Sequence, residues 1–386
     1  MNHRIESLID TLKHTKELKT RKNIIKSLGS SESQLVIPVL IEALKEEEPV
    51  INMAAAEALE RIGFPAMKQL IFLLTSKDER VRGRVARILG KLRNKDAIIP
   101  LMSLCHLDPD PLVRCFAIES LVAIDDQHAR MAIINGLKDT TSLVRGISVD
   151  TLVKANSIDP VEKIELLAES LKDPDPIVRC KSVKFLGTLV NDSVTEHLVS
   201  VLQDSDIIVR IEAVKALGNL ADSKAISSLV NIIQEDLFTD LQWEATEALG
   251  KMGTPAAKDL IIALKSNRRE VRFLAAKALG EIKDEESVIP LINALNDGEW
   301  LVQEEAARAL KSTGRVIISP LIEIVSQKAN NLAEEALEKV MDLLVFFEAG
   351  KEELKPIESL LLSIVLTGTE ERLKKSATEL LKQLDS

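Results

Sequence analysis

The segment Asp173-Pro-Asp-Pro-Ile-Val-Arg-Cys-Lys-Ser-Val-Lys-Phe-Leu-Gly187 decides the fold, because its plan recurs along most of the chain. The plan is an acidic turn, a Val-Arg dipeptide, small or aliphatic residues at helical spacing, and a closing Leu-Gly. It returns from Asp204 to Gly218, from Asp108 to Val122 and from Asp139 to Val153. A unit repeated at a fixed period predicts a solenoid, in which each repeat buries its apolar face against its neighbours.

The period is regular over ten copies. When the arginine of the Val-Arg dipeptide is used as the reference, the successive intervals are 31, 30, 32, 31, 34, 31, 32, 30 and 31 residues. Weaker copies around Glu334 and from Glu370 to Leu384 bring the total to about twelve repeats. The reference positions are Arg21, Asn52, Arg82, Arg114, Arg145, Arg179, Arg210, Gln242, Arg272 and Gln303.

Each repeat contains two helical patterns, here called A and B. Helix A is typified by residues 96–107 and 287–295, and helix B is the Val-Arg segment. The Asp-Pro-Asp-Pro turns end helix A and provide carboxylates that cap helix B. Glycines near the end of helix B are predicted to be its C-terminal caps. They are Gly29, Gly63, Gly90, Gly187, Gly218, Gly250 and Gly280.

Composition supports an all-α protein. Apolar residues make up 46% of the chain but aromatic residues only 3%, so the core consists of Leu, Ile, Val and Ala. We expect residues 1–386 to form a single solenoid, with regular repeats over about 4–345 and degenerate capping repeats over about 329–386. The longest interval falls at residues 155–160, which predicts a hinge; the alternative is an insertion accommodated in a surface turn.

The repeat resembles a known family. The Asp-Pro, Val-Arg, Ala-Leu-Gly plan of Asp204 to Gly218 and of Arg269 to Gly280 is similar to HEAT repeats, specifically the HEAT-like repeats of phycobilisome (phycobilin) lyases. The resemblance covers about residues 4–345. It implies a right-handed α-α superhelix with the B helices on its concave side. Such repeats occur in lyases, scaffolds and regulatory proteins alike, so the resemblance does not fix the function.

The arginine of the Val-Arg dipeptide is predicted to be buried. At about 100° per residue it lies on the same arc of helix B as the apolar positions around it. A buried charge needs a partner, and the acid six positions earlier in the same repeat is the one we expect. The predicted ladder is Asp108 with Arg114, Asp139 with Arg145, Asp173 with Arg179, and Asp204 with Arg210. Asp236 with Gln242 and Asp297 with Gln303 would be neutral, weaker rungs.

The opposite arc of helix B, at positions one, two, five and nine after the reference residue, is predicted to be exposed. These positions run from basic through apolar to acidic along the chain, and large apolar residues at exposed positions of successive repeats are typical of a partner-binding surface. The predicted binding residues are Arg84, Arg87, Lys91, Lys181, Lys184, Ile211, Trp243, Phe273, Leu274, Glu304 and Glu305. The alternatives are that Trp243 and Phe273 pack between neighbouring helices and that the basic residues are a solvated helix face.

The sequence contains no pattern that indicates catalysis. The five histidines show no i, i+4 pairing, and no phosphate-binding loop or nucleophile elbow is present, so we predict no catalytic residues, no metal and no cofactor. The formal net charge of −10 makes nucleic-acid binding unlikely on electrostatic grounds, although the cationic positions of repeats three and six leave it open.

Three cysteines without metal-ligand spacing indicate a reducing compartment, and the chain lacks the apolar run of a signal peptide or membrane span, so we expect a cytoplasmic protein. The function that we expect is a non-catalytic scaffold or adaptor that holds a protein or peptide on the concave surface. The alternative, implied by the family resemblance, is a phycobilin lyase-like protein that handles a bilin on the same surface, with Arg84 or Lys181 meeting its propionates.

Overall fold

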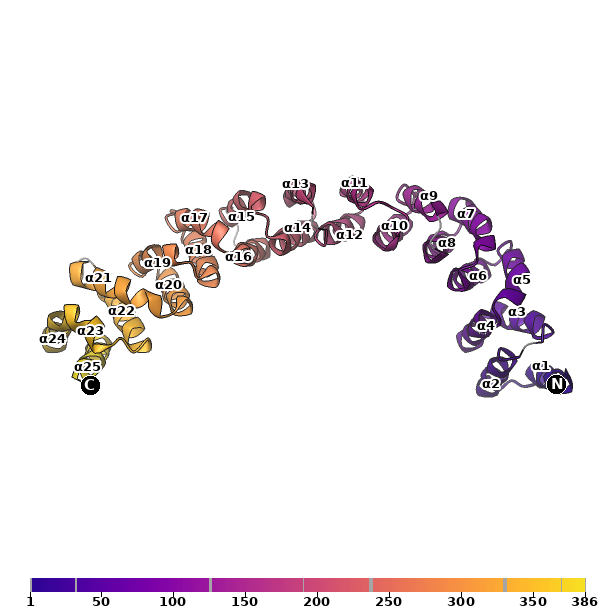
Figure 1. The fold of residues 1–386 in the computed structure, drawn as a ribbon, viewed down its shortest axis with the longest axis horizontal. Coiled ribbons are helices and arrows are strands. Elements are labelled where there is room, and N and C mark those ends of the chain that lie inside the picture. The colour runs from indigo at the N-terminus through magenta and orange to yellow at the C-terminus, as the bar shows by residue number, and fades with distance from the viewer. Residues whose placement is uncertain are drawn as a thin grey trace. The chain divides into compact units, whose positions relative to one another are not determined.

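A computed structural model describes residues 2–31, 33–124, 127–189, 191–235, 239–328, 332–368 and 370–385. Throughout these ranges all regular secondary structure is helical, as the repeat predicts. By its internal contacts the chain divides into two compact units, Met1–Phe185 and Leu186–Ser386. Each unit is an α-solenoid of paired helices, shown in Figure 1.

The helices of the first unit are α1 (Asn2–His14), α2 (Leu18–Leu28), α3 (Val36–Lys45), α4 (Pro49–Ile62), η1 (Phe64–Ala66), α5 (Met67–Leu73), α6 (Glu79–Leu92), η2 (Lys95–Ala97), α7 (Ile98–Leu107), α8 (Pro111–Ile124), α9 (Gln127–Gly136), α10 (Ser142–Lys154), α11 (Pro160–Ser170) and α12 (Pro176–Leu186), of which α12 ends at the boundary.

The helices of the second unit are α13 (Asp192–Ser200), η3 (Val201–Gln203), α14 (Ile207–Leu220), η4 (Ser223–Ala225), α15 (Ile226–Ile233), α16 (Asp240–Met252), α17 (Thr254–Ala263), α18 (Arg269–Ile282), η5 (Glu285–Ser287), α19 (Val288–Ala294), α20 (Trp300–Thr313), η6 (Arg315–Ile317), α21 (Ile318–Lys328), α22 (Glu334–Phe346), α23 (Lys351–Leu354), η8 (Lys355–Ile357), α24 (Glu358–Thr367) and α25 (Glu371–Asp385).

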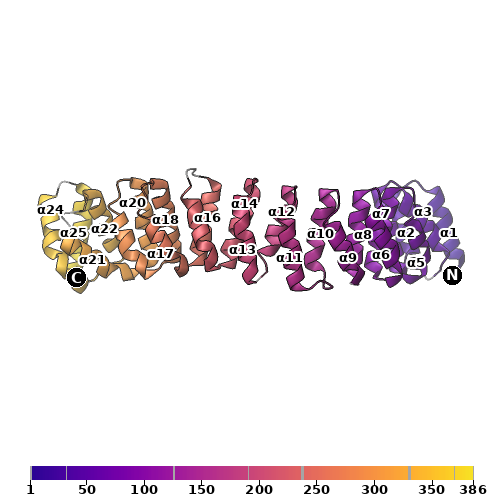
Figure 2. The same cartoon turned by 90° about the horizontal axis from the view of Figure 1, so that it is seen from above.

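In the described part of the chain the helices pair into twelve repeats, from α1 with α2 to α24 with α25. Up to α22, odd-numbered helices form the A layer of each unit and even-numbered helices form the B layer (Figure 1). Within a unit the helices stand side by side (Figure 2). Neighbouring B helices such as α18 and α20 pack closely, whereas the A helices α19 and α21 touch at few points. Closer packing of the B layer makes it the inner layer, and the first unit bends toward it (Figure 1).

The Leu-Gly glycine has a different role from the one predicted. Gly90, Gly218 and Gly280 lie inside the last turn of their B helices, and the helices continue for two more residues. A methyl group at Gly280 would come 2.8 Å from the Cα and Cβ atoms of Ala309 in the next B helix, and one at Gly218 would come 2.7 Å from Cβ of Ala248. The glycine therefore lets consecutive B helices touch, backbone against side chain.

The caps of these helices are non-glycine residues in the left-handed region. Arg93, Ala221 and Lys283 end α6, α14 and α18 with φ values of 51°, 52° and 56°. The prediction of glycine caps was correct for Gly29 and Gly63, which end α2 and α4 with φ values of −65° and 68°. Gly253, which was not predicted as a cap, ends α16 with a φ of 73°. A side chain in the left-handed region costs free energy, so three of the repeats carry local strain at the same place.

A ladder of buried arginines is present, but its register differs from the prediction. Arg114 Nε and Nη2 donate to both carboxylate oxygens of Asp139 in the next repeat, each at 2.8 Å. Its Nη1 donates to the main-chain oxygen of Asp108, the aspartate of its own repeat, at 2.9 Å. The guanidinium therefore joins two consecutive A–B turns. The other described rungs are Arg21 with Glu46, Arg82 with Asp108, Arg145 with Asp173, and Arg272 with Asp297.

The predicted side-chain pairs Asp108 with Arg114 and Asp139 with Arg145 are therefore wrong. Arg145 donates to the main-chain oxygen of Asp139 at 2.9 Å, and Arg179 donates to that of Asp173 at 2.7 Å. The pairs of Asp173 with Arg179 and of Asp204 with Arg210 stay predictions. Each aspartate also shapes its turn by accepting from a backbone N–H, as Asp204 does from Asp206 at 2.8 Å. Arg210, next in the predicted ladder, precedes a turn whose Asp236 lies outside the described residues.

The shifted register accounts for the neutral positions. Asn52 and Ser76, which would form one rung, are both neutral, and so are Gln242 and Ser266. Asp297, predicted to face Gln303, pairs instead with Arg272 at 2.6 Å. Gln303 and Gln242 keep the contact to their own turn, Gln303 with the main-chain oxygen of Asp297 at 2.7 Å and Gln242 with that of Glu235 at 2.9 Å. The joints between α4 and α6 and between α16 and α18 therefore lack a charged rung.

Residues 155–160, which lengthen the interval between two repeats, form a turn that packs into the first unit. Ala155 and Ile158 are buried, and Asp159 caps α11 by accepting from the backbone N–H of Val161 at 2.8 Å. These contacts favour the alternative of an accommodated turn. A hinge at this place stays a prediction, and so does a single solenoid over residues 1–386.

Candidate partner-binding surface

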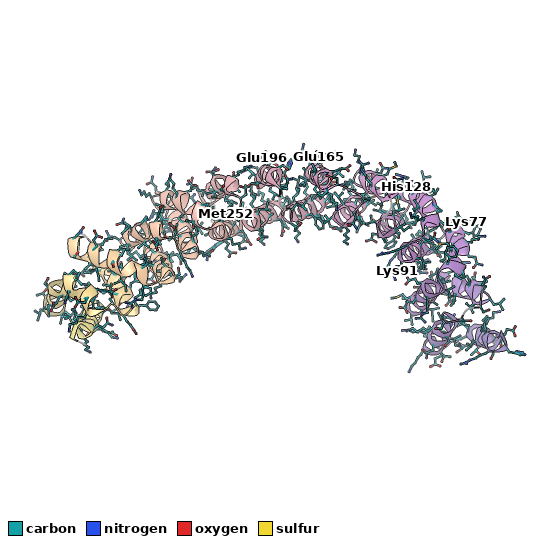
Figure 3. The ribbon with its side chains drawn as sticks, viewed as in Figure 1. Lys77, Lys91, His128, Glu165, Glu196 and Met252 are labelled. Atoms are coloured by element: carbon teal, nitrogen blue, oxygen red, sulfur yellow. The ribbon has the colours of Figure 1, made fainter. Side chains whose placement is uncertain are left out.

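The exposed side of the B helices is called here the B wall of each unit. Lys91 points outward on this side of the first unit, whereas Glu165 of α11 lies on the A side (Figure 3). The wall consists of side chains at fixed positions relative to the reference arginine, so that corresponding residues of successive repeats lie in rows. Positions two before and one, two, five and nine after the reference form one ridge of each helix.

On α6 the predicted basic residues contact the preceding repeat. Arg84 Nη1 donates to the main-chain oxygens of Leu44 and Glu46 at 2.7 and 3.2 Å, and Lys91 pairs with Glu60 at 2.8 Å. Burial lowers the pKa of Arg84. A further arginine of this helix, Arg80, pairs with Glu47 at 3.2 Å.

These contacts cross the joint between α4 and α6, which lacks a charged rung. Arg80, Arg84 and Lys91 thus hold this joint together, and two of them, Arg80 and Lys91, pair with carboxylates of the preceding repeat. Arg87 lies over the ring of Phe116 in the next repeat, 5.3 Å from its centroid, and is exposed. The solvated or structural interpretation of the basic positions is favoured over a nucleic-acid surface.

The two lysines of α12 differ from each other. Lys181 Nζ contacts the Asp150 carboxylate at 2.5 Å and the main-chain oxygen of Gly146 at 3.2 Å, both in α10. Lys184, one turn further, is exposed. Position two therefore faces the preceding repeat, and position five faces solvent.

The same rule corrects two predicted residues of the second unit. Leu274 is 0% exposed and belongs to the core, and Glu305 is 5% exposed and pairs with Arg308 at 2.7 Å. Both stand at position two, which packs against the preceding B helix, so neither lies on the open surface. Glu304 at position one is exposed and forms an ion pair with Lys339.

The aromatic centre of the second B wall is assembled as a cluster. Ile211, Trp243 and Phe273, all at position one, are half-buried on α14, α16 and α18. The rings of Trp243 and Phe273 meet edge to face, with centroids 5.9 Å apart and planes at 77°. Lys277 Nζ lies 5.4 Å from the Trp243 centroid. The cluster covers the joint between α16 and α18, where Gln242 and Ser266 leave the ladder without charge.

A row of exposed apolar residues in the first unit was missed. Leu112, Leu143 and Ile177 stand two positions before the reference arginine on α8, α10 and α12, and they are 50, 45 and 65% exposed. The prediction considered only positions after the arginine. The positions two before and two after the reference arginine are four residues apart and therefore lie on the same face of the helix, which places these residues on the wall.

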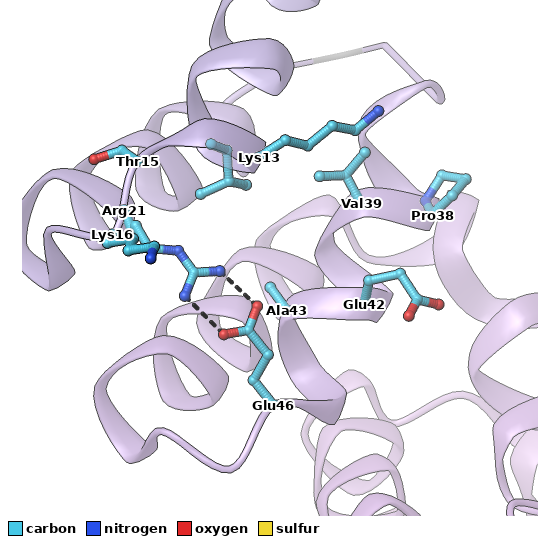
Figure 4. A pocket seen from close by; sticks show the side chains of 10 residues that line it. Lys13, Thr15, Lys16, Arg21, Pro38, Val39, Glu42, Ala43 and Glu46 are labelled. Atoms are coloured by element: carbon cyan, nitrogen blue, oxygen red, sulfur yellow. Dashed lines mark hydrogen bonds and ion pairs between the residues drawn. The ribbon is translucent and has the colours of Figure 1, made fainter.

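Two cavities open beside rungs of the ladder. One of about 650 Å³ opens beside the Arg21–Glu46 rung between α1 and α3 and has Leu12 and Val39 in its lining (Figure 4). A cavity of about 460 Å³ is placed in the same way beside Arg145 and Asp173. Cavities of this kind form in both places because neighbouring A helices are further apart than neighbouring B helices.

Among the described residues no group of histidine, cysteine and acidic side chains could hold a metal ion. In the same part of the chain, no helix has the length and hydropathy needed to cross a membrane. Burial raises the pKa of Cys105 to about 12 and that of Cys115 to about 11.

The repeats match a known family. A model of HEAT repeats matches residues 5–71, 67–153, 164–250, 195–267 and 257–341. The chain belongs to the HEAT repeat family. No curated protein has a significantly similar sequence to this HEAT repeat protein.

Solved structures share the fold of this HEAT repeat protein. The crystal structure of Kap121p matches with a TM-score of 0.62 and 14% identity, over 99% of this chain and 49% of that one. The karyopherin Kap121p bound to the extreme C-terminus of the protein phosphatase Cdc14p gives 0.63 and 15%, over 98% and 49%. Importin beta gives 0.51 and 13%, over 99% and 61%. The chain thus spans about half the length of Kap121p, and at these identities the likeness establishes the fold alone.

Proposed function

We propose that this protein is a non-catalytic scaffold that holds a protein or peptide partner on the B wall of its second unit. The observation that carries the proposal is the apolar row of Ile211, Trp243 and Phe273 at one position of three successive B helices. Tryptophan and other large side chains in such clusters dominate the binding energy of many interfaces. The proposed site comprises this row, with Lys215 beside it and Glu304 at its acidic end.

The wall supplies the polar rim that a specific interface needs. Lys215 pairs with Glu244 at 3.1 Å next to the row, and Glu247 and Lys251 are exposed on the same helix as Trp243. Charged residues around an apolar centre orient a partner and exclude mismatched ones. Kap121p, which shares the fold, is described with the extreme C-terminus of another protein bound, and by analogy we propose a protein segment as the partner here.

The test is affinity capture from the native organism with the full chain and with Trp243→Ala/Phe273→Ala. A matched control is Ile262→Ala, which removes an apolar side chain that is 60% exposed on α17 of the A layer. We expect the double variant to lose partners that the control retains. Because Trp243 and Phe273 also cover a joint, Ile211→Glu is added as a variant at the edge of the row. Equal capture by all four proteins would contradict the proposal.

The finer resemblance to phycobilin lyases gives the alternative proposal, a bilin held on the B wall. Arg84 and Lys181 were the predicted contacts of its propionates, yet both already contact the preceding repeat. An absorbance shift on mixing the purified protein with a bilin would support this alternative over the scaffold. A reducing, cytoplasmic compartment remains our proposal, and among the described residues no cysteine forms a disulfide.

A further inference from the structure

The apolar row of the first B wall is not required by the packing of the repeats. Leu112, Leu143 and Ile177 occupy the position that Asp240 and Glu270 occupy in α16 and α18 of the same chain. A position that accepts carboxylates in two repeats has no need of large aliphatic side chains in three others. Three in succession, each about half exposed, form a continuous apolar surface on α8, α10 and α12.

A second row widens this surface. Phe116 and Ile147, one turn further along α8 and α10, stand at position two and pack against the preceding helix, but unlike Leu274 they are only half-buried, so part of each side chain stays exposed. Position one of α8 and α10 holds the small buried residues Cys115 and Gly146, and the Lys181 side chain lies over Gly146, 3.5 Å from an added methyl group. The two rows together form an apolar strip across the B helices, two side chains wide, which is called the groove here.

The spacing of the groove selects the conformation of its occupant. Packed helices lie about 8–10 Å apart, so the three anchors repeat at roughly 10 Å. An α-helix returns to the same face every seven residues, which is about 10.5 Å. A β-strand covers about 10 Å in three residues, which places the third on the opposite face. A polyproline helix has a matching repeat of about 9.3 Å but presents a narrow edge. The two-row width fits the broad apolar face of an amphipathic α-helix.

The charges beside the groove are mostly acidic. Asp110 and Asp175 cap α8 and α12 at its edge, accepting from the backbone N–H groups of Val113 and Ile177 at 3.0 and 2.8 Å. A hydrogen bond with the Ser142 side chain, together with that from Ile177, lowers the pKa of Asp175. On the other side lies exposed Glu119.

The cations beside the groove include exposed Arg87 of the preceding repeat, which lies over the Phe116 ring. Lys181 is paired with Asp150, which leaves Lys184 as a cation at the α12 end. Carboxylates on both sides of an apolar groove complement a ligand with basic flanks.

We propose that the groove formed by Leu112, Leu143 and Ile177 with Phe116 and Ile147 binds a basic amphipathic α-helix of a partner protein, lying across α8, α10 and α12. This second surface is separate in residues and in unit from the Trp243 cluster, and its test can succeed or fail independently of the proposed scaffold site.

The probe is a fluorescent synthetic peptide of about 21 residues, three heptads long, with leucines on one face and lysines beside them. Binding to the full chain is followed by fluorescence anisotropy at two salt concentrations. Two control peptides accompany it: one with glutamate in place of lysine, and one with leucine at every third residue among prolines. We expect the basic helical peptide to bind and both controls to bind at least about ten-fold more weakly.

The decisive variant is Leu143→Glu/Ile177→Glu, since the fold already carries carboxylates at this position in α16 and α18. It should weaken binding about ten-fold or more, whereas Ile99→Glu, at a residue of α7 that is 70% exposed, should leave it unchanged. The proposal would be overturned if Leu143→Glu/Ile177→Glu and Ile99→Glu bound the basic helical peptide equally well. It would also be overturned if the proline-rich peptide bound more tightly than the helical one. A melting curve for each variant shows whether it is folded, and Leu112→Gln provides a milder change on the same row.

Discussion

Arg114 contacts the aspartate of its own repeat only at the backbone and places its guanidinium on the carboxylate of Asp139, the aspartate of the next repeat. Both side chains are almost buried, with 11 and 12% of their surface exposed. The arginine therefore ties its own turn to the next one, whose aspartate lies 25 residues further along the chain than the arginine, and the ladder holds repeats to each other.

A double-mutant cycle distinguishes the observed register from the one within a repeat. We expect Arg114→Gln and Asp139→Asn each to lower the free energy of unfolding by about 3 kcal/mol, because each leaves a nearly buried charge without its partner. Their coupling energy should be about 2 kcal/mol, and that of Arg114→Gln with Asp108→Asn below about 0.5 kcal/mol. Urea unfolding measures all three values. A larger coupling with Asp108 would contradict the observed register.

The same rung predicts a pH dependence. Burial alone would raise the pKa of Asp139, but hydrogen bonds from Arg114 and Thr141 outweigh it, and the net pKa is lowered. A carboxyl whose pKa is lower in the folded protein contributes its full stability above its unfolded pKa of about 4, and loses it as the pH falls through the folded value. The stability difference between wild type and Asp139→Asn should therefore be constant near neutrality and shrink below about pH 4.

The uncharged joint between α16 and α18 can be converted into a charged one. Gln242→Arg and Ser266→Asp recreate the pair found at Arg272 and Asp297. We expect each single change to destabilise the chain, since it adds a partly buried charge. The double variant should have a free energy of unfolding about 1–2 kcal/mol higher than the sum of the two single effects predicts. Thermal unfolding measures the effect. Strictly additive changes would show that the two positions do not meet.

The helix-contact glycines predict a steric penalty. Gly280→Ala places a methyl group 2.8 Å from Ala309, so we expect a loss of about 1–3 kcal/mol despite the better helix propensity of alanine. Gly298→Ala is the control, because nothing lies within 4 Å of its new methyl group. Urea midpoints compare the two variants, and an unchanged Gly280→Ala would contradict the close contact.

The strained cap at Ala221 predicts a gain. Its φ of 52° is unfavourable for alanine, and glycine adopts this conformation freely. Ala221→Gly should raise the unfolding free energy by up to about 1 kcal/mol. The reference change, Ala307→Gly inside α20, should lower it by about 1 kcal/mol. Equal losses in both variants would show that Ala221 is not left-handed.

Buried thiols give a measure of folding. Because burial raises the pKa values of Cys105 and Cys115 to about 12 and 11, both should react slowly with a thiol reagent at pH 8. Denaturant should expose them and increase the rate in step with the loss of helix. Mass spectrometry of labelled peptides identifies the residues, and fast labelling of Cys105 in the native protein would contradict its burial.

Much of the fold follows from the sequence, because a period of about 31 residues with two helical patterns has few other solutions. The register of the ladder did not follow, since an arginine on helix B can reach either of two aspartates and spacing alone favours the nearer one. A signal was nonetheless present: Asn52 with Ser76 and Gln242 with Ser266 are both neutral only when each arginine position is matched to the following turn. Leu274 and Glu305 were misplaced because the helical arc alone does not show which side a neighbouring helix covers.

The uncharged joint in the second unit has a mechanical meaning. If the unit is pulled or twisted, we expect deformation to concentrate at the joint that lacks a charged rung. The side-chain contacts across this joint include the aromatic pair, Lys277 over Trp243, and the hydrogen bonds from Arg268 to the main-chain oxygens of Gln234 and Glu235. Trp243 and Phe273 lie on the two sides of this joint. A partner that binds both would therefore stiffen the joint and impose a local curvature that matches the shape of the partner.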